Sequence, residues 1–266
     1  WIELKKAAID GRGIENTARV IADVSPDVLA VVEVEDRPTL RRFHDAVLKP
    51  VLTAAGKALY PYDMVIDGND DRGIDVGILS RFPIRSMRSH ITDVTPAGKK
   101  TFSRDCPEYY VTLPGGKELA VLPNHFASKG SDKTGARRKV QSAGVAAIYA
   151  EVKKTHDLVL VAGDLNDHPA GGSLDALVAQ TDLKDAMALP EYKGAFPGTY
   201  EHGNATQKFD YLLMSPKLAA SVKTVDVERR GFYAPTKWPS YAGITGKNKD
   251  LTQASDHHCV WADVDV

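Results

Sequence analysis

The sequence predicts a single domain, either of α/β type or built from two packed sheets. Its 266 residues and 43% hydrophobic content are enough to bury a large core. Apolar segments of strand length alternate along the chain with segments that have helical spacing. No internal repeat, low-complexity stretch or linker divides the chain, so we expect residues 1–266 to form one domain.

The composition excludes several classes of protein. No run of about eighteen or more apolar residues is present, so we expect no transmembrane helix and no stable membrane association. The net charge of −1 means that a polyanionic substrate must be held by local basic side chains and a metal, not by a general positive field. Cys106 and Cys259 form neither a metal cluster nor a disulfide framework, and the sequence leaves open whether they are free or bridged.

The first half of the chain supplies one helix and three strands. Residues 16–24 have helical spacing, Pro26 ends the helix, and Val28–Val34 follows as an apolar strand. Residues 73–84 (GIDVGILSRFPI) and 117–126 (KELAVLPNHF) are further strands, because they are rich in β-branched and aliphatic side chains.

The second half of the chain continues the alternation. Residues 134–154 place apolar side chains at helical spacing and end in lysines, which favours a helix that leads directly into the strand 158–163. Residues 173–180 predict a short helix and residues 209–215 a strand. Residues 257–266 predict a terminal strand, since polar and apolar side chains there alternate between two faces.

Polar side chains gather where these strands end. The ends of strands in two packed sheets can converge at one rim, so we expect a single functional site there. The residues concerned are Glu33, Asn124, His125, Asp164, Asn166, Asp210, Asp256 and His257.

The stretch GDLND, residues 163–167, places Asp164 and Asn166 two positions apart, so in extended backbone their side chains point the same way. A carboxylate that orients water, beside an amide that donates to a phosphoryl oxygen, suits phosphoryl transfer. An ordinary tight turn explains the same five residues equally well.

The stretch SDHH, residues 255–258, is more specific. Asp256 can bind a metal, and His257 has an ordinary pKa of about 6.5, which lets it exchange protons near neutral pH. Asp210 can hold the imidazole of His257 through its second nitrogen, as a buried carboxylate does in hydrolase triads. His258 falls on the other face of the strand, and we interpret it as a structural histidine.

Glu33, in the strand exit VEVED, is a hard oxygen ligand that suits Mg²⁺ or Mn²⁺ better than zinc. Glu35 and Asp36 could take the same role, and an acidic strand exit into solvent explains all three. Arg104 offers a fork of donors that matches a phosphate, or it forms an ion pair with Asp105. His125 can donate to a phosphate, although taken alone it is better explained as a satisfied histidine at a strand end.

No glycine-rich phosphate loop, nucleophile elbow or zinc-type spacing of histidines and cysteines is present. This disfavours P-loop nucleotide hydrolysis, serine hydrolysis and zinc hydrolysis. Metal-assisted hydrolysis of a phosphoester, or no catalysis at all, are the alternatives that remain.

The order of the motifs carries a resemblance. The segments PDVLAVVEVED, GIDVGILSR, TFSRD, PNHF, GDLND, FDYLLMSP and SDHHCVW together resemble the endonuclease/exonuclease/phosphatase superfamily, from about residue 15 to the C-terminus. The resemblance implies a deoxyribonuclease I-like fold, which is a four-layered α/β/β/α sandwich of two mixed β-sheets with its site at one rim. It also implies hydrolysis of a phosphoester with Mg²⁺ or Mn²⁺ as cofactor.

The resemblance assigns roles residue by residue, although Val32 stands for the usual glutamine and Leu165 for the usual phenylalanine. Asp75 is a looser candidate, for orienting His125. The implied metal ligands are Glu33 and Asp256, the implied catalytic residues are His125, Asp164, Asp210 and His257, and the implied phosphate-binding residues are Arg104, Asn124 and Asn166.

The chain departs from the family at its start. The family opens with a central strand whose asparagine shares the metal, and no such strand precedes WIELKKAAID. Losing a central strand would expose two strand edges, so we expect the first strand to lie N-terminal to Trp1. Asn16 falls in the predicted helix and is a poor substitute for that asparagine.

The sequence favours a nuclease, with a phosphomonoesterase for inositol phosphates or nucleotides, or an inactive binding module, as alternatives. We expect a monomer, and an exported or periplasmic location is favoured over a cytoplasmic one. The long loop 231–254 should lie beside the site. Its aromatic side chains, among them Trp238 and Tyr241, could stack on bases, meet a lipid surface or pack against the domain.

Overall fold

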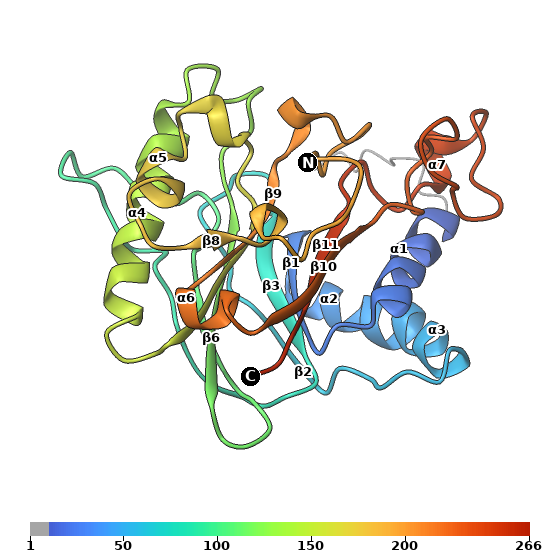
Figure 1. The fold of residues 1–266 in the computed structure, drawn as a ribbon, viewed down its shortest axis with the longest axis horizontal. Helices are drawn as coiled ribbons and strands as arrows, with labels where there is room; N and C mark the ends of the chain where they lie inside the picture. The colour runs from blue at the N-terminus through green and yellow to red at the C-terminus, as the bar shows by residue number, and fades with distance from the viewer. Residues whose placement is uncertain (1–10) are drawn as a thin grey trace, which may run out of the picture.

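The computed structural model describes residues 11–266, in which short helices and strands alternate (Figure 1). A π-helical turn at His44–Leu48 joins the second and third helices. The elements in chain order are α1 (Gly11–Val24), β1 (Val28–Val34), α2 (Arg37–Phe43), α3 (Lys49–Ala54), β2 (Tyr62–Val65), β3 (Asp75–Ser80), β4 (Ile84–Arg88), β5 (Glu108–Thr112), β6 (Glu118–His125), α4 (Ala136–Val152), β7 (Leu158–Asp164), α5 (Asp175–Val178), β8 (Lys184–Asp185), β9 (Asp210–Met214), α6 (Pro216–Ala219), β10 (Val222–Glu228), α7 (Lys249–Thr252) and β11 (Cys259–Val264).

The predicted four-layered sandwich is confirmed. A six-stranded sheet of order β4-β5-β6-β7-β9-β8 carries α4 and α5 on its outer face, and the strands β1-β3-β2 and β10-β11 face its inner side (Figure 1). Helices α1, α2 and α3 form the fourth layer. Three apolar clusters fill the three interfaces: one contains Val145 of α4, one Val121 of β6 between the sheet layers, and one Leu52 of α3.

The inner layer differs from the expected second mixed sheet. In the described part of the chain, β1 pairs only with β3 and β11 pairs only with β10, and both pairings are antiparallel. A cavity of about 610 Å³ lies between them, lined by Leu29 and Val31 of β1, Val260 and Ala262 of β11, and Leu160 beneath. The strand that we predict N-terminal to Trp1 lies outside the described residues, and it stays a prediction.

The elements with a strong local pattern lie where the sequence predicts them. Strand β1 covers the predicted residues Val28–Val34, α4 falls within the predicted helix 134–154, and β7 extends the predicted strand 158–163 by one residue, to Asp164. The sequence missed α2, β5 and β10 among others. Strand β5 shows no clear period because both of its faces are covered: Tyr109 and Val111 lie in the cluster between the sheet layers, and Tyr110 packs against the cluster under α4. Helix α2 depends on a cap in which Asp36 accepts a hydrogen bond from the Thr39 N–H at 2.6 Å.

Both cysteines are free thiols in the structure, with Cys106 buried in the cluster under α4 and Cys259 at the start of β11. Burial raises the pKa of each thiol, so neither is a reactive thiolate at neutral pH. None of the described helices is long and apolar enough to cross a membrane.

The aromatic side chains singled out in the loop 231–254 pack against the domain. Trp238 is 8% exposed and meets the ring of Phe196 edge-on at 5.0 Å. Tyr241 is 6% exposed and its hydroxyl donates to Asp23 of α1 at 2.9 Å. Of the three predicted roles for these two residues, packing is therefore the one that the structure supports.

Candidate active site

Strand register brings three of the predicted residues side by side. His125 at the end of β6 pairs with Asp164 at the end of β7, and Asp164 pairs with Asp210 at the start of β9. Because β6 and β7 are parallel while β9 runs the other way, all three residues lie at one edge of the six-stranded sheet. The predicted convergence of strand ends is thus found here.

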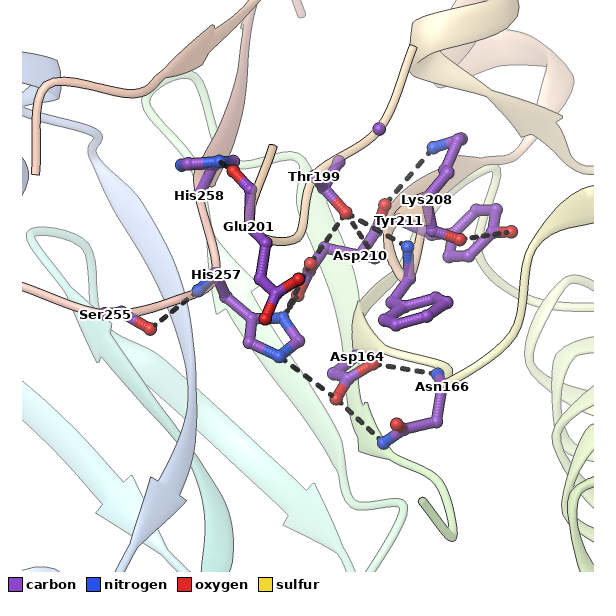
Figure 2. Close-up of polar contacts among 12 residues, drawn as sticks. Asp164, Asn166, Thr199, Glu201, Lys208, Asp210, Tyr211, Ser255, His257 and His258 are labelled. Carbon is purple, nitrogen blue, oxygen red and sulfur yellow. Dashed lines mark hydrogen bonds and ion pairs between the residues drawn. The ribbon is translucent and has the colours of Figure 1, made fainter. Parts of the chain in front are cut away.

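Asp164 and Asn166 form a closed pair (Figure 2). The Asp164 carboxylate accepts from the Asn166 backbone N–H at 2.8 Å and from the Asn166 side-chain amide at 2.8 Å. The backbone of Asn166 is left-handed, with φ of 53°, a conformation that asparagine tolerates better than most residues. The two side chains therefore meet through a turn, whereas the sequence predicted their proximity from extended backbone.

His257 lies between two carboxylates (Figure 2). Its Nδ1 contacts Asp210 Oδ2 at 2.9 Å, as the sequence predicts, whereas its Nε2 is 4.0 Å from Asp164 Oδ2. His125 approaches the same Asp164 oxygen, with its Nε2 at 3.5 Å. The ligand atoms of Asp164, Asp210 and His257 all lie within 4.8 Å of one another.

Burial and the charges of neighbouring side chains shift the pKa values of this group. Burial, followed by the negative charge of Asp210, raises the pKa of the Asp164 carboxyl well above its ordinary value. Burial would lower the pKa of His257, but the charge and hydrogen bond of Asp210 outweigh it and raise that pKa to about 10. Burial and the neighbouring positive charge of His257 lower the pKa of His125 to about 4, so His125 is neutral at pH 7.

Glu33 reaches the rim because of a bulge in β1. The pairing of β1 with β3 shifts between Val32 and Val34, and Glu33 there has a left-handed φ of 58°. Its side chain is 62% exposed, and its Oε1 lies 4.0 Å from His125 Nε2. Asp36, one of the alternative ligands, is instead the cap of α2.

Asp256 is exposed beside His257, where its charge helps to raise the pKa of that imidazole. In the same way the charge of Glu33 acts on Asp164. The two predicted metal ligands therefore act on the central group by their charge, although neither belongs to the set of atoms that converge within 4.8 Å.

Arg104 lies next to the site, but its side chain is buried and does not line the exposed side of the site. It is 3% exposed, its Nε lies 2.9 Å from Asp70 Oδ2, and its Nη1 donates to the Phe126 carbonyl at 3.3 Å. The same carbonyl accepts from the Asn166 amide at 3.1 Å, so Arg104 lies directly behind the Asp164–Asn166 pair. Its ion-pair partner is Asp70, not Asp105 as the sequence had allowed.

Asn124 does not face the site, and this corrects the prediction that it binds phosphate. It is 1% exposed and its amide donates to the Leu122 carbonyl at 3.0 Å. Neighbouring side chains of a strand point to opposite faces, so Asn124 turns inward because His125 turns toward the rim. Asp75 also has another partner, since it accepts from the Gly68 N–H at 2.8 Å, and His125 Nδ1 is buried without a hydrogen bond among the described residues.

Several residues near the site were missed by sequence reasoning. Thr199 donates to Asp210, Asp70 pairs with Arg104, and Lys208 donates to the Asp210 carbonyl at 3.2 Å. Thr199 and Asp70 lie in irregular connections without any periodic pattern, so no local signal marks them. Lys208 is 6% exposed, which is rare for lysine, but its place before the strand 209–215 gives no local signal of that burial.

The residues present fit a hard divalent cation. The central group offers carboxylate oxygens, and burial makes the charged form of Asp164 costly in the absence of a nearby cation. Glu33 and Asp256 add two further carboxylates at the sides. Oxygen-rich donors with one imidazole suit Mg²⁺ or Mn²⁺, whereas no group of cysteines and histidines of zinc type occurs among residues 11–266.

Known proteins resemble this chain in both sequence pattern and structure. A family model described as "Endonuclease/Exonuclease/phosphatase family" matches residues 9–257. Truncated TDP2 from Caenorhabditis elegans is 18% identical with a TM-score of 0.61, and the likeness covers 93% of this chain and 88% of that one. A mannosyl-6-phosphatase of Bacteroides thetaiotaomicron is 16% identical with a TM-score of 0.65 over 96% and 91% of the two chains.

The catalytic domain of human Nocturnin is 14% identical, with a TM-score of 0.56 over 80% of this chain and 76% of that one. No curated protein matches the sequence at a significant level. At these identities the structural likenesses show the fold alone, which is the deoxyribonuclease I-like sandwich. The family match extends over residues 9–257, and this range includes every predicted site residue from Glu33 to His257.

Proposed function

Because the chain belongs to the endonuclease/exonuclease/phosphatase family, we propose that it is a divalent-metal-dependent phosphodiesterase that acts on nucleic acid. The observation that carries the proposal is the convergence of Asp164, Asp210 and His257 within 4.8 Å. Such a group can hold a cation and move a proton beside it, which are the requirements of metal-assisted phosphoester hydrolysis.

Glu33 and Asp256 remain our proposed metal ligands, next to the carboxylates of the central group. When bound, Mg²⁺ or Mn²⁺ supplies Lewis-acid stabilisation of the negative charge that develops on the phosphoryl oxygens. The protein's own contribution is to keep the acidic side chains at the rim in fixed positions, through the bulge at Glu33 and the hydrogen bonds of Asp164.

The chain's other residues divide the chemistry among them. Asp164 orients the attacking water, and Asp164 and His257 handle its proton as a pair whose facing atoms are 4.0 Å apart. Asp210 holds His257 by its Nδ1 at 2.9 Å and stabilises the imidazolium. Neutral His125 donates to a phosphoryl oxygen. The Asn166 amide uses its two N–H groups for Asp164 and for the Phe126 carbonyl, so it would give up one of these bonds to donate to the phosphate. Arg104 donates to the same Phe126 carbonyl and adds a positive charge behind Asn166.

Two alternatives to a nuclease remain. A phosphomonoesterase for inositol phosphates or nucleotides would use the same central group, and one structural relative is described as a mannosyl-6-phosphatase. A catalytically inactive binding module would keep the fold without turnover. The convergence of Asp164, Asp210 and His257, with a hydrogen bond between Asp210 and His257, argues against the inactive module.

The test compares bis-p-nitrophenyl phosphate with p-nitrophenyl phosphate, each with Mg²⁺, Mn²⁺ or EDTA, for wild type and His257→Ala. We expect turnover of the diester that needs both metal and His257, followed by cleavage of DNA or RNA. Turnover of the monoester alone would favour the phosphatase. Suppose the protein binds metal but hydrolyses neither of these two esters and none of DNA, RNA, inositol phosphates or nucleotides. That result would overturn the proposal that it is an enzyme.

We also propose that the first strand, which we predict N-terminal to Trp1, lies in the cavity between β1 and β11. Strands of one sheet are about 4.8 Å apart, so a single segment could pair with both open edges. In the full-length protein, the amides of β1 and β11 that face the cavity should then exchange hydrogen as slowly as those of β6. Fast exchange at those amides, or a dimer in light scattering in place of the expected monomer, would contradict this.

A further inference from the structure

Thr199 is a buried hydroxyl to which the proposed mechanism gives no role. Its side chain is completely buried, and its Oγ1 lies 2.7 Å from Asp210 Oδ2. The same Oγ1 accepts hydrogen bonds from the backbone N–H groups of Phe209 at 3.0 Å and Asp210 at 2.9 Å. Both acceptor positions of the hydroxyl are therefore occupied, so its hydrogen must point to the Asp210 carboxylate (Figure 2).

The Asp210 oxygen that accepts from Thr199 is also the one nearest His257. His257 Nδ1 is 2.9 Å from Asp210 Oδ2 and 3.1 Å from Oδ1. A carboxylate held by a donor on one side cannot rotate without losing that hydrogen bond. Thr199 thereby fixes the carboxylate plane that Nδ1 meets, and with it the direction in which Nε2 points toward Asp164.

The backbone of the same segment holds His257 from the other side. The His258 N–H donates to the Thr199 carbonyl at 2.8 Å, and the Glu201 N–H donates to the Asp256 carbonyl at 2.7 Å. Tyr200 and His257 form an antiparallel bridge between these two bonds. Residues 199–201 thus contact both members of the Asp210–His257 pair, one through a side chain and the other through the main chain.

Backbone strain marks this segment as well. Glu201 has a left-handed φ of 43°, and two of the other three non-glycine residues with positive φ within residues 11–266 are Glu33 and Asn166 of the proposed site. Left-handed backbone at a glutamate has a conformational cost and persists only where surrounding bonds over-determine it. At Glu201 those bonds include the ones to Asp256 and His258.

We propose that Thr199 is a positioning residue for the reaction, whose hydroxyl aligns the Asp210 carboxylate with His257. The assignment rests on the proposed function, and it adds a third member to the Asp210–His257 pair. Thr199 touches no substrate. Its loss should therefore slow the chemical step and leave substrate binding unchanged.

Thr199→Val removes the hydroxyl and keeps the shape of the side chain, and Thr199→Ser keeps the hydroxyl. Hydrogen bonds to charged groups correspond to an expected fall in kcat of about 10- to 100-fold for Thr199→Val, with KM within about twofold. Thr199→Ser should stay within about threefold of wild type in kcat. Thr252→Val is the matched control, since Thr252 is equally buried but its hydroxyl donates to the Asn248 carbonyl, away from the pair.

A spectroscopic readout separates this inference from the proposed function. The His257 Nδ1 proton, hydrogen-bonded to Asp210, should give a downfield proton resonance in wild type, Thr199→Ser and Thr252→Val. In Thr199→Val that resonance should move upfield or broaden through exchange with water. The readout needs no turnover, so it decides on Thr199 even if the protein proves to hydrolyse no ester.

Two results would overturn the positioning role. One is an unchanged kcat and an unchanged Nδ1 resonance in folded Thr199→Val. The other is an equal loss of activity and of thermal stability in Thr199→Val, Thr199→Ser and Thr252→Val, which would show that any change at a buried threonine has the same general effect. If Thr199→Val does not fold, loss of the resonance in folded Thr199→Ala, with its retention in Thr199→Ser, takes its place.

Discussion

Two histidines of this protein lie between two carboxylates, one near the β4–β5 edge and one at the proposed site. His90 contacts Asp93 through Nδ1 at 2.8 Å and Glu108 through Nε2 at 2.8 Å. His257 has one such partner, Asp210, while its Nε2 stays 4.0 Å from Asp164. The His90 side chain is also only 6% exposed, whereas the His257 side chain is 28% exposed.

The difference separates a structural histidine from a chemically useful one. Both nitrogens of His90 must donate, since both partners are carboxylates, so its proton has nowhere to go and its ring is fixed. His257 is fixed by one nitrogen and keeps the other free, at a distance that a water or a phosphoryl oxygen can bridge. Similar partners thus give different roles, and a gap of about one ångström decides between them.

The largest effect should come from replacing His257, whose Nε2 stays 4.0 Å from Asp164. His257→Asn should lower kcat by about 10²- to 10⁴-fold, because the chain loses its proposed general acid–base group, while thermal stability changes little. Steady-state hydrolysis of the diester checks this. His90→Gln is the control and should keep wild-type kcat per folded molecule, and a loss of activity as large as that of His257→Asn would remove the distinction.

Replacing His90, whose two ring nitrogens both contact carboxylates, should affect stability instead of activity. His90→Gln should lower the free energy of unfolding by about 2–3 kcal/mol, because Glu108 is buried and loses a charged partner. Urea unfolding at pH 6 measures this. A change of under about 0.5 kcal/mol would mean that Tyr110 and Arg88, the other partners of Glu108, hold it without His90.

The same pair should give a pH-dependent stability. Burial would lower the pKa of His90, but hydrogen bonds to Glu108 and Asp93 raise it above 6.5, and the pKa of Glu108 is lowered, with burial opposed by its bonds to His90 and Tyr110. A raised histidine pKa stabilises the fold fully below the unfolded value and loses this effect as pH rises through the folded value. The stability difference between wild type and His90→Gln should therefore be constant from about pH 5.5 to 6.5 and shrink above it. Urea unfolding at several pH values tests this, and a difference that grows above pH 7 would contradict it.

The smallest effect should come from the exposed partner of His90. The Asp93 side chain is 47% exposed, so Asp93→Asn should cost only about 0.5 kcal/mol in unfolding free energy. Glu108→Gln, at a side-chain exposure of 3%, is the matched comparison and should cost several times more. Equal costs for the two variants would show that burial does not set the strength of these pairs.

The local pattern of the sequence was enough for much of the fold. The strands Val28–Val34, 158–163 and 209–215 and the helix at 134–154 were all predictable, because period and apolar content are local properties. The gathering of polar residues at strand ends also followed from the sequence. Short elements such as α2 and β8 were not predictable, since they depend on a cap or on a neighbouring strand.

The site shows the same division. The sequence alone determined the strand-end residues His125, Asp164 and Asp210 and the terminal Asp256–His257 pair, since chain order and residue type identify them. Only the tertiary structure decided which way each side chain turns: Asn124 inward, Arg104 behind Asn166 and Glu33 outward on a bulge. It also brought Thr199 to Asp210 and left His257 Nε2 open while both nitrogens of His90 are engaged. These outcomes depend on register, backbone strain and distances between segments far apart in sequence, and local pattern carries no information about them.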